Sequence, residues 1–323
     1  MNTDRLFTDG VLVVDKPSGP TSHDVVAVTR RVLRRVGAAG APPSKSRRGA
    51  PIKVGHTGTL DPLASGVLPL VLGKATRLAQ FLSASDKEYV ADVELGVSTN
   101  TLDRGGEVID RPKSREVESL TRAMIEEAVA AFQGTYFQLP PDYSAKKVDG
   151  DRAYDLARRN EPLKLRPVEV TARSLEVLEW KGSLLKLRLV CSPGYYVRSL
   201  ADDLGSKLGT GAHLAALVRT RSGDFGLKDA VALDDLDRQP EAAAARVIPL
   251  ASLLPALPSV ILTPAGAALA ARGGFIGPSH CAPGTIFPAP GRVRLLHPDG
   301  HLVAVAAPRA GAADLLHPSV VLE

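Results

Sequence analysis

The chain has 323 residues, of which 44% are hydrophobic and 23% are charged, with a formal net charge of +5. This length exceeds the size at which a single hydrophobic core usually stops growing, so we expect two domains. The apolar fraction excludes a mainly disordered chain. Two cysteines are too few for a disulfide scaffold or a four-ligand zinc site.

The first predicted elements are a strand and a basic helix. Gly10–Lys16 is a short apolar run that ends at a Pro-Ser-Gly turn. Ser22 can cap a helix whose valines recur at helical spacing, at Val25, Val28, Val32 and Val36. Between Val25 and Leu60 there are eight basic residues and no acidic one. Because this charge continues into a flexible arm at 37–51, we expect the region to contact a polyanion.

The central part of the sequence mixes strands and helices without a regular βαβ rhythm. Apolar or alternating patterns predict strands at Val67–Leu72, Tyr89–Leu95, Val168–Trp180 and Leu185–Leu189. Helical patterns run over Thr76–Leu82, Val117–Phe132 and Leu200–Leu208. A polar, basic insertion occupies 140–167. The irregular order of elements favours an α+β fold over a doubly wound sheet.

Val247–Ala271 is a stretch of 25 residues without a charge, which is long enough to span a bilayer. Prolines interrupt it at Pro249, Pro255, Pro258 and Pro264, so we do not expect a continuous helix. We interpret it as a connection into a small β-rich module that begins near Leu257. The N-terminus lacks a secretory apolar region, and we therefore expect a cytoplasmic protein without a membrane segment.

Nucleotide-binding and metal-binding motifs find no support in the sequence. Six residues separate Gly66 from the Gly73-Lys74 pair, and an alanine follows the lysine, whereas a phosphate loop needs four residues and then Ser or Thr. Only His297 and His301 form a close pair beside a carboxylate, and they flank a Pro-Asp-Gly turn. We interpret these two histidines as turn-stabilising or solvent-facing residues, and we expect no metal site.

Gly55–Gly66 (GHTGTLDPLASG) specifies a defined irregular backbone, because it has three glycines and a proline in twelve residues. It also contains His56 and Asp61. On general grounds Asp61, which precedes a proline, is a turn former. The complete sequence of the segment around Asp61 indicates a functional role in addition to a turn.

Gly55–Arg77 (GHTGTLDPLASGVLPLVLGKATR) resembles the characteristic motif of the tRNA pseudouridine-55 synthases, the TruB branch of the pseudouridine synthases. Further segments resemble other motifs of this family and follow the family's order, at Gly10–Gly19, Lys87–Asp103, Tyr143–Lys147 and Gly194–Gly205. The resemblance extends from Gly10 to about Arg221 and is weaker beyond Leu257.

This resemblance implies a catalytic domain over residues 1–250, with the mixed, largely antiparallel sheet of the pseudouridine synthase fold and flanking helices. It also implies a small, β-rich, PUA-type RNA-binding domain over residues 257–323. The insertion at 140–167 corresponds to a thumb that closes over RNA. The basic insertion at 37–51 has no counterpart in compact members, so no role is transferred to it.

The implied reaction converts uridine 55 in the T loop of tRNA to pseudouridine without a cofactor. Asp61 corresponds to the catalytic aspartate, whether it attacks the sugar or the base or removes a sugar proton. Arg198 corresponds to the cation that pairs with it, since a cation favours the charged form of an enclosed carboxylate. The resemblance makes Tyr89 the ring that stacks on the flipped base. Tyr196 is also expected to lie against the flipped base, and it lies on the same side as Arg198 if the chain is extended there.

Two further residues complete the implied binding site. His56 corresponds to the residue that fills the space left by the flipped base, and Leu217 to a contact with that base. Each implied residue also has a purely structural interpretation: a core aromatic for Tyr89, a helix-start arginine facing Asp202 for Arg198, a solvated loop histidine for His56 and core packing for Leu217.

The expected partner is tRNA, and the protein is expected to be a monomer without an obligatory protein partner. One alternative is the guide-RNA-dependent relative of archaea and eukaryotes, which the thumb and the short C-terminal domain argue against. A second is a non-catalytic RNA-binding or RNA-folding protein, which the intact set of Asp61, Tyr89 and Arg198 argues against. A third is a glycoside hydrolase, which lacks a matched second acid in Gly55–Gly66.

Overall fold

The computed structural model describes residues 6–39, 52–109, 113–142, 147–148, 151–152, 165–285, 291–309 and 311–323. Most of the basic insertion predicted at 37–51 lies outside the described residues. The same is true of most of the thumb-like insertion predicted at 140–167. Of that insertion, the structure describes the short hairpin of β8 (Lys147–Val148) and β9 (Asp151–Arg152).

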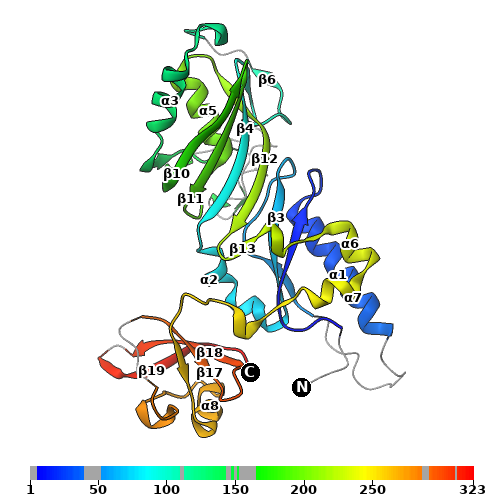
Figure 1. Cartoon of the computed structure of the whole chain (residues 1–323), viewed down its shortest axis with the longest axis vertical. Coiled ribbons are helices and arrows are strands. Elements are labelled where there is room, and N and C mark those ends of the chain that lie inside the picture. The colour runs from blue at the N-terminus through cyan, green and yellow to red at the C-terminus, as the bar shows by residue number, and fades with distance from the viewer. Residues whose placement is uncertain are drawn as a thin grey trace.

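One large mixed sheet runs through the molecule (Figure 1). Its strand order is β14 (Val231–Ala232), β1 (Gly10–Lys16), β3 (Ser65–Leu72), β12 (Ala212–Ser222), β4 (Lys87–Leu95), β11 (Leu184–Cys191), β10 (Val168–Lys181) and β7 (Gly134–Gln138). The short strands β2 (Val54–His56), β13 (Phe225–Gly226) and β15 (Ile248–Pro249) extend it. Neighbours are antiparallel except at β14–β1 and β3–β12. The predicted α+β class with a largely antiparallel sheet is therefore confirmed.

Helices cover the sheet in two groups. The helices α1 (Ser22–Ala39), α6 (Leu233–Arg238) and α7 (Pro240–Ala245) lie beside β1, and α3 (Arg122–Ala130) and α5 (Val197–Leu208) lie beside β10 and β11 (Figure 1). The remaining small elements are α2 (Ala79–Ser83), β5 (Ser98–Thr99), β6 (Val108–Ile109) and the 3-10 turns at Gly73–Leu78, Val117–Ser119, Leu227–Asp229, Leu250–Ser252 and Pro278–His280.

The strand β1 is buried on both faces, which explains its continuous apolar run. Leu12 and Val14 pack into the core beneath the helices. Val11 and Val13 pack into a second core on the opposite face. By contrast, β4 alternates between buried and half-buried residues, as its sequence pattern predicts.

The start of α1 differs from the prediction. Thr21 forms the cap, because its hydroxyl accepts a hydrogen bond from the Asp24 amide at 3.1 Å and the Asp24 carboxylate accepts one from the Thr21 amide at 2.8 Å. Ser22 instead exchanges hydrogen bonds with the backbone of Leu60, donating to its carbonyl at 3.0 Å and accepting from its amide at 2.8 Å. The predicted capping residue therefore ties the helix to the Gly55–Gly66 segment.

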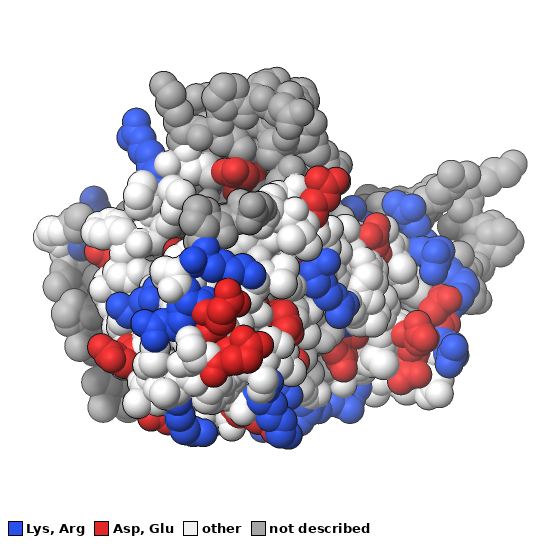
Figure 2. Space-filling view, turned by 90° about the horizontal axis from the view of Figure 1, so that it is seen from above, with Lys and Arg blue, Asp and Glu red and all other residues white. Residues whose placement is uncertain are grey.

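The basic face of α1 is also less free than the local sequence indicates. Arg31 and Arg35 both pair with Asp237 of α6, at 3.9 and 3.0 Å. Arg30 donates to the Val54 carbonyl at 2.7 Å. An acid far along the chain thus compensates part of the predicted basic cluster, and these arginines hold α6 and β2 against α1. At the end of the molecule drawn in Figure 2, basic and acidic side chains are likewise interspersed.

A second sheet of four strands lies at the C-terminal end, in the order β16 (Ser259–Ile261), β17 (Val293–Leu296), β18 (Leu302–Arg309) and β19 (Ala312–Val321). The helix α8 (Pro264–Ala271) packs on it (Figure 1). The uncharged stretch Val247–Ala271 therefore divides into short elements. Among the described residues, no helix has the length and apolar character needed to cross a membrane.

Candidate active site

A cavity of about 270 Å³ opens where the Gly55–Gly66 segment, β4, β12 and the start of α5 meet. Five of the six residues predicted for the site line it: Asp61, Tyr89, Tyr196, Arg198 and Leu217. The other described lining residues are Thr57, Gly58, Thr59, Leu60, Ser83, Lys87, Ser192, Pro193, Gly194, Tyr195, Val197 and Arg219. Residues separated by more than 150 positions therefore form one enclosure.

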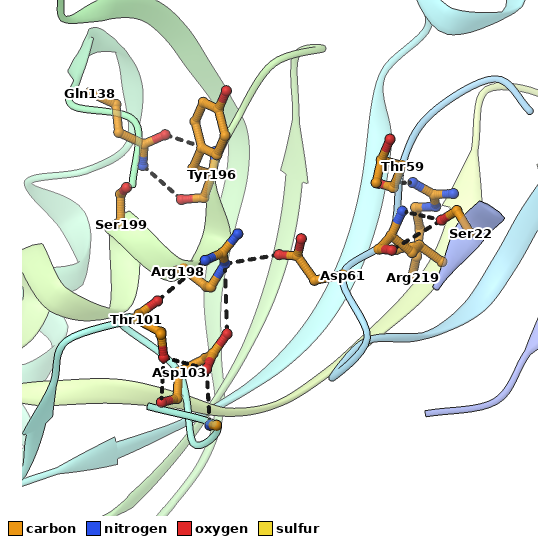
Figure 3. A network of polar contacts seen from close by, with 12 residues as sticks. Ser22, Thr59, Asp61, Thr101, Asp103, Gln138, Tyr196, Arg198, Ser199 and Arg219 are labelled. Carbon is orange, nitrogen blue, oxygen red and sulfur yellow. Dashed lines mark hydrogen bonds and ion pairs between the residues drawn. The ribbon is translucent and has the colours of Figure 1, made fainter. Parts of the chain in front are cut away.

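Asp61 and Arg198 both line this cavity and point toward one another (Figure 3). The Arg198 Nε lies 2.8 Å from the Asp61 Oδ2, and the arginine side chain is buried whereas that of Asp61 is 37% exposed. The carboxylate is thus held by a charge-assisted hydrogen bond on one side and remains accessible on the other. This contact keeps the Asp61 carboxylate charged and oriented, and its exposed side can still reach a ligand.

Asp103, a residue without a predicted role, lies on the far side of Arg198. Its Oδ2 is 3.9 Å from the Arg198 Nε. Its Oδ1 accepts hydrogen bonds from the Thr101 hydroxyl at 2.7 Å and the Gly105 amide at 2.9 Å. The Arg198 Nη1 also donates to the Thr101 carbonyl at 3.3 Å. The arginine is therefore fixed by the 98–105 region as well as by Asp61 (Figure 3).

The backbone at Asp61 forms a turn, in agreement with the general interpretation of its sequence. The Ala64 amide donates to the Asp61 carbonyl at 3.0 Å, with Pro62 at the second position of the turn. The turn uses the backbone of Asp61 and leaves its carboxylate free for Arg198. The structural and the functional interpretation of this residue therefore apply together.

Arg219 holds the Gly55–Gly66 segment from the side of β12, and the sequence interpretation missed it. Its guanidinium donates to the carbonyls of Val67 at 2.7 Å, Gly58 at 3.1 Å and Thr59 at 3.5 Å, and the residue is only 1% exposed. Gly66 permits this approach: its φ is +98°, and a Cβ there would lie 2.3 Å from the Arg219 carbonyl oxygen. The local sequence has no signal for these contacts, because the partners are about 150 residues away.

Tyr196 and Arg198 are not joined by the extended chain that the sequence analysis considered. An extended chain would put both on one side, but α5 begins at Val197, so Arg198 lies in its first turn. The backbone of Tyr196 is clamped by the buried amide of Gln138, which donates to the Tyr196 carbonyl at 2.9 Å and accepts from its amide at 2.8 Å. This clamp fixes the chain where α5 begins (Figure 3).

Tyr89 and Leu217 occupy neighbouring strands at the buried side of the cavity. In the β4–β12 register Tyr89 lies opposite Arg219 and Leu217 opposite Ala91. Burial raises the pKa of the Tyr89 hydroxyl, so this group stays protonated at neutral pH. Both residues belong to the main core, so the core-packing interpretation and the lining role coincide.

His56 is the predicted site residue that does not line the described cavity. It ends β2, and its ring meets that of His23 edge to face at 5.7 Å between centroids. The Gly58 amide lies 3.4 Å from its Nδ1. Burial, with His23 and Arg219 nearby, lowers the pKa of His56, which favours a neutral ring at neutral pH.

Two buried lysines add positive charge around the cavity. Burial lowers the pKa of Lys16 to about 8, an effect that the Asp61 carboxylate partly offsets. Burial and then Arg219 lower the pKa of Lys87 to about 8, and its ammonium donates to the carbonyls of Ser83 and Ser85. Both lysines are still largely protonated at neutral pH. Asp61 and Asp24 lie close enough to Lys16 to act against the lowering of its pKa, and Asp86 does the same for Lys87, so acidic side chains offset part of this charge.

Comparison with known proteins identifies the family of the chain. Residues 46–197 match the TruB family pseudouridylate synthase (N terminal domain), and residues 198–262 match the tRNA pseudouridylate synthase B C-terminal domain. The chain is 44% identical to tRNA pseudouridine synthase B of Solibacter usitatus (strain Ellin6076) over 97% of this chain and all of the relative. It is 41% identical to tRNA pseudouridine synthase B of Thermobifida fusca (strain YX) over 95% and 97%.

Solved structures share the fold of the chain at lower sequence identity. An H/ACA RNP bound to a substrate RNA containing 2'-deoxyuridine has a TM-score of 0.70 and 25% identity, covering 100% of this chain and 91% of that one. A Cbf5-Nop10-Gar1 complex has a TM-score of 0.69 and 28% identity, covering 98% and 85%. From the full-length relatives and the matched residues we conclude that this chain belongs to the TruB family of pseudouridylate synthases.

Proposed function

We propose that the protein converts uridine 55 in the T loop of tRNA to pseudouridine, with Asp61 as the catalytic carboxylate. The main support for this proposal is the Asp61–Arg198 pair. It consists of an accessible carboxylate held at 2.8 Å by a buried arginine, in a cavity of about 270 Å³. The relatives that span almost the whole chain are named tRNA pseudouridine synthase B, which supports tRNA as the substrate.

The reaction is an isomerisation. The bond from N1 of uracil to C1′ of the ribose breaks, the base turns, and a bond from C5 to C1′ forms. C5 then loses its proton and N1 gains one, so atoms and electrons balance without an oxidant or reductant. Asp61 starts the exchange, either by forming a bond to the sugar or base or by removing a sugar proton. Arg198 holds the carboxylate in the orientation that each of these routes requires.

The target base has to leave the RNA stack to enter the cavity, which costs a few kcal/mol. Stacking on the ring of Tyr89 returns about 1–3 kcal/mol, and Leu217 gives the base an apolar contact. His56 lies beside the cavity, on the segment that carries Asp61, and fills the place that the base leaves. The neutral ring favoured by its lowered pKa suits insertion between bases.

The positive charge around the cavity suits a nucleotide. Lys16, Lys87, Arg198 and Arg219 are all buried. These cations attract the phosphate groups that enter with the flipped nucleotide. In this proposal the C-terminal sheet, β16 to β19, is the PUA-type module that binds another part of the tRNA.

The rival functions fit less well. A glycoside hydrolase needs two carboxylates that face the sugar, and Asp103, the acid nearest to the pair, is not among the described residues that line the cavity. A purely RNA-binding protein has no use for an oriented carboxylate. The chains in the H/ACA RNP and Cbf5-Nop10-Gar1 structures show 25% and 28% identity, below the 44% of the Solibacter usitatus protein.

The test is to incubate the protein with an unmodified tRNA transcript and map pseudouridine at each position. We expect product at position 55 only, and none from a transcript with cytidine there. Asp61→Asn should lower the single-turnover rate at least about a thousandfold (about 4 kcal/mol) while tRNA affinity stays within about twofold. Asp234→Asn, a change at an acid of α6 whose side chain is 79% exposed, is the matched control. Product from Asp61→Asn at the wild-type rate removes Asp61 from the mechanism, and product at another uridine changes the assigned position.

A further inference from the structure

The turn between β17 and β18 brings together side chains that the sequence interpretation assigned to a simple hairpin. The Gly300 amide donates to the His297 carbonyl at 2.8 Å, and the His297 amide donates to the His301 carbonyl at 2.9 Å. His297 and His301 therefore face one another across the turn. Their rings stack with centroids 4.5 Å apart and planes 18° apart.

Three atoms that can bind a metal converge at this turn. The Nδ1 atoms of His297 and His301 lie 3.0 and 2.5 Å from the same oxygen, Oδ1 of Asp299. All three atoms are within 4.8 Å of one another. Zinc binds imidazole nitrogen and carboxylate oxygen at about 2.0–2.2 Å, which in a tetrahedral site separates neighbouring ligand atoms by about 3.4 Å. Small side-chain rotations would therefore admit an ion.

A turn alone does not account for the orientation of His297. The Asp299 amide donates to the Nδ1 of His297 at 3.3 Å, which requires a lone pair on that nitrogen. The same nitrogen lies 3.0 Å from the Asp299 carboxylate oxygen, which is also an acceptor. With a proton on Nδ1 the amide contact becomes unfavourable, and without one the carboxylate contact does. A metal ion on Nδ1 would use this lone pair for a bond of about 2.0–2.1 Å and would replace both of these weaker contacts.

A further carboxylate supports His301 from behind. The Nε2 of His301 lies 2.6 Å from Oε1 of Glu323. A carboxylate on the outer ring nitrogen holds the proton at Nε2 and leaves the lone pair of Nδ1 for a metal, as is usual for metal-binding histidines. The side chains of His297, Asp299 and His301 are 31–51% exposed, so an ion can reach them from solvent.

We propose that His297, Asp299 and His301 bind a divalent transition-metal ion of the zinc class, with Glu323 as the positioning residue for His301. Three protein ligands leave the fourth position of a tetrahedral ion to water. The ion joins the β17–β18 turn to the C-terminal residue through Glu323. This proposal does not depend on the proposed function, because its test measures bound metal and not activity.

The experiment titrates Zn²⁺ into the full-length protein after removal of any affinity tag and treatment with a chelator. Isothermal titration calorimetry should give one ion per chain with a micromolar Kd. His301→Gln and His297→Gln should each weaken binding at least about tenfold, and Glu323→Gln by about 10–100-fold, as expected for an outer-shell partner. His317→Gln, at an exposed histidine of β19, should leave the Kd unchanged.

Nitrogen NMR of the imidazole rings provides a second measurement on the wild-type chain. Zn²⁺ should shift the Nδ1 resonances of two histidines, and these two should disappear in the double variant His297→Gln/His301→Gln. The proposal is overturned if the wild type shows no saturable binding at 100-fold excess of Zn²⁺ over protein, or if the double variant binds with the wild-type Kd. Equal weakening by His317→Gln would also overturn it, because the ion would then bind elsewhere.

Discussion

Arg198 lies between two carboxylates, and its shape matters as much as its charge. Its Nε lies 2.8 Å from the Asp61 carboxylate, and its Nη1 donates a hydrogen bond to the Thr101 carbonyl at 3.3 Å. A guanidinium can satisfy both because its donors project in fixed directions from one plane. A lysine ammonium has the same charge but concentrates its donors at one point, so it cannot keep both contacts.

We therefore expect Arg198→Lys to separate orientation from charge. Loss of one charge-assisted hydrogen bond costs about 1.5–3 kcal/mol, which corresponds to a fall of about 10–150-fold in the single-turnover rate of pseudouridine formation. Affinity for tRNA should stay within about twofold. Arg188→Lys is the control, since this arginine pairs with Glu88 at 3.3 Å on the exposed side of the sheet. A rate near that of the wild type, or a defect in affinity alone, would contradict the orienting role.

At the residue scale the sequence predicted five of the residues that line the cavity, but not always the element that carries them. Asp61, Tyr89, Tyr196, Arg198 and Leu217 all reach the cavity, although Arg198 does so from a helix and not from an extended chain. The roles of these residues stay proposals. Arg219 and Asp103 escaped prediction because their contacts join segments far apart in the chain, and a motif records residue types without recording such contacts.

The Gly55–Gly66 segment shows how neighbouring elements hold an irregular loop in place. Arg219 of β12 binds three carbonyls in and just after this segment, and Ser22 at the start of α1 binds both backbone groups of Leu60. In each contact one partner lies in or just after the segment, and the other partner lies elsewhere in the chain. The segment depends on tertiary contacts for its conformation, and its glycines only make that conformation possible.

Arg219→Met keeps most of the side-chain volume but removes all three hydrogen bonds. At about 1 kcal/mol for each bond, the free energy of unfolding should fall by about 3 kcal/mol. If Arg219 positions the segment, amide exchange at residues 57–64 should accelerate, and the single-turnover rate should fall at least about tenfold in protein that is still folded. Arg221→Met, two residues along β12 with a side chain 40% exposed, should change neither. Unchanged exchange at residues 57–64 would show that Arg219 contributes to stability alone.

At the element scale many strands and helices followed from apolar spacing, but the strands β7 and β12 were not predicted, and the helix expected over Val117–Phe132 forms as a 3-10 turn and the shorter α3. The strands β1 and β4 and the helix α1 agree with the expected ranges, because burial on one or two faces imposes a simple period. The cap of α1 was wrong, because Thr21 and Ser22 are both good capping residues and only the distant Leu60 decides between them. Asp237, which pairs with Arg31 and Arg35 of α1, is about 200 residues away.

On the scale of the whole molecule, the two sheets share a hydrophobic core. Leu302, Val305 and Leu322 of the C-terminal part pack with Val11, Val13 and other residues on the face of the large sheet opposite α1. Arg77 donates to the Val321 carbonyl at 2.5 Å, and the Arg292 guanidinium lies over the Phe81 ring at 5.2 Å. The sequence predicted a second module near Leu257 but not this attachment, because the period of each strand indicates which face is buried and not what covers it.

Leu302→Ala tests this attachment. Leu302 belongs to the shared core, whereas Leu316, equally buried, belongs to the internal core of the C-terminal sheet. Either truncation should lower the free energy of unfolding by about 3 kcal/mol, but the two variants should loosen different parts of the molecule. Leu302→Ala should loosen the attachment, so the radius of gyration from X-ray scattering should rise while the amides of β17 to β19 keep their protection from exchange. Leu316→Ala should reduce that protection instead.

If the C-terminal sheet binds tRNA jointly with the active site, Leu302→Ala should also weaken tRNA affinity without lowering the single-turnover rate at saturating enzyme. A radius of gyration and an affinity that both match the wild type would mean that the shared core does not fix the C-terminal sheet.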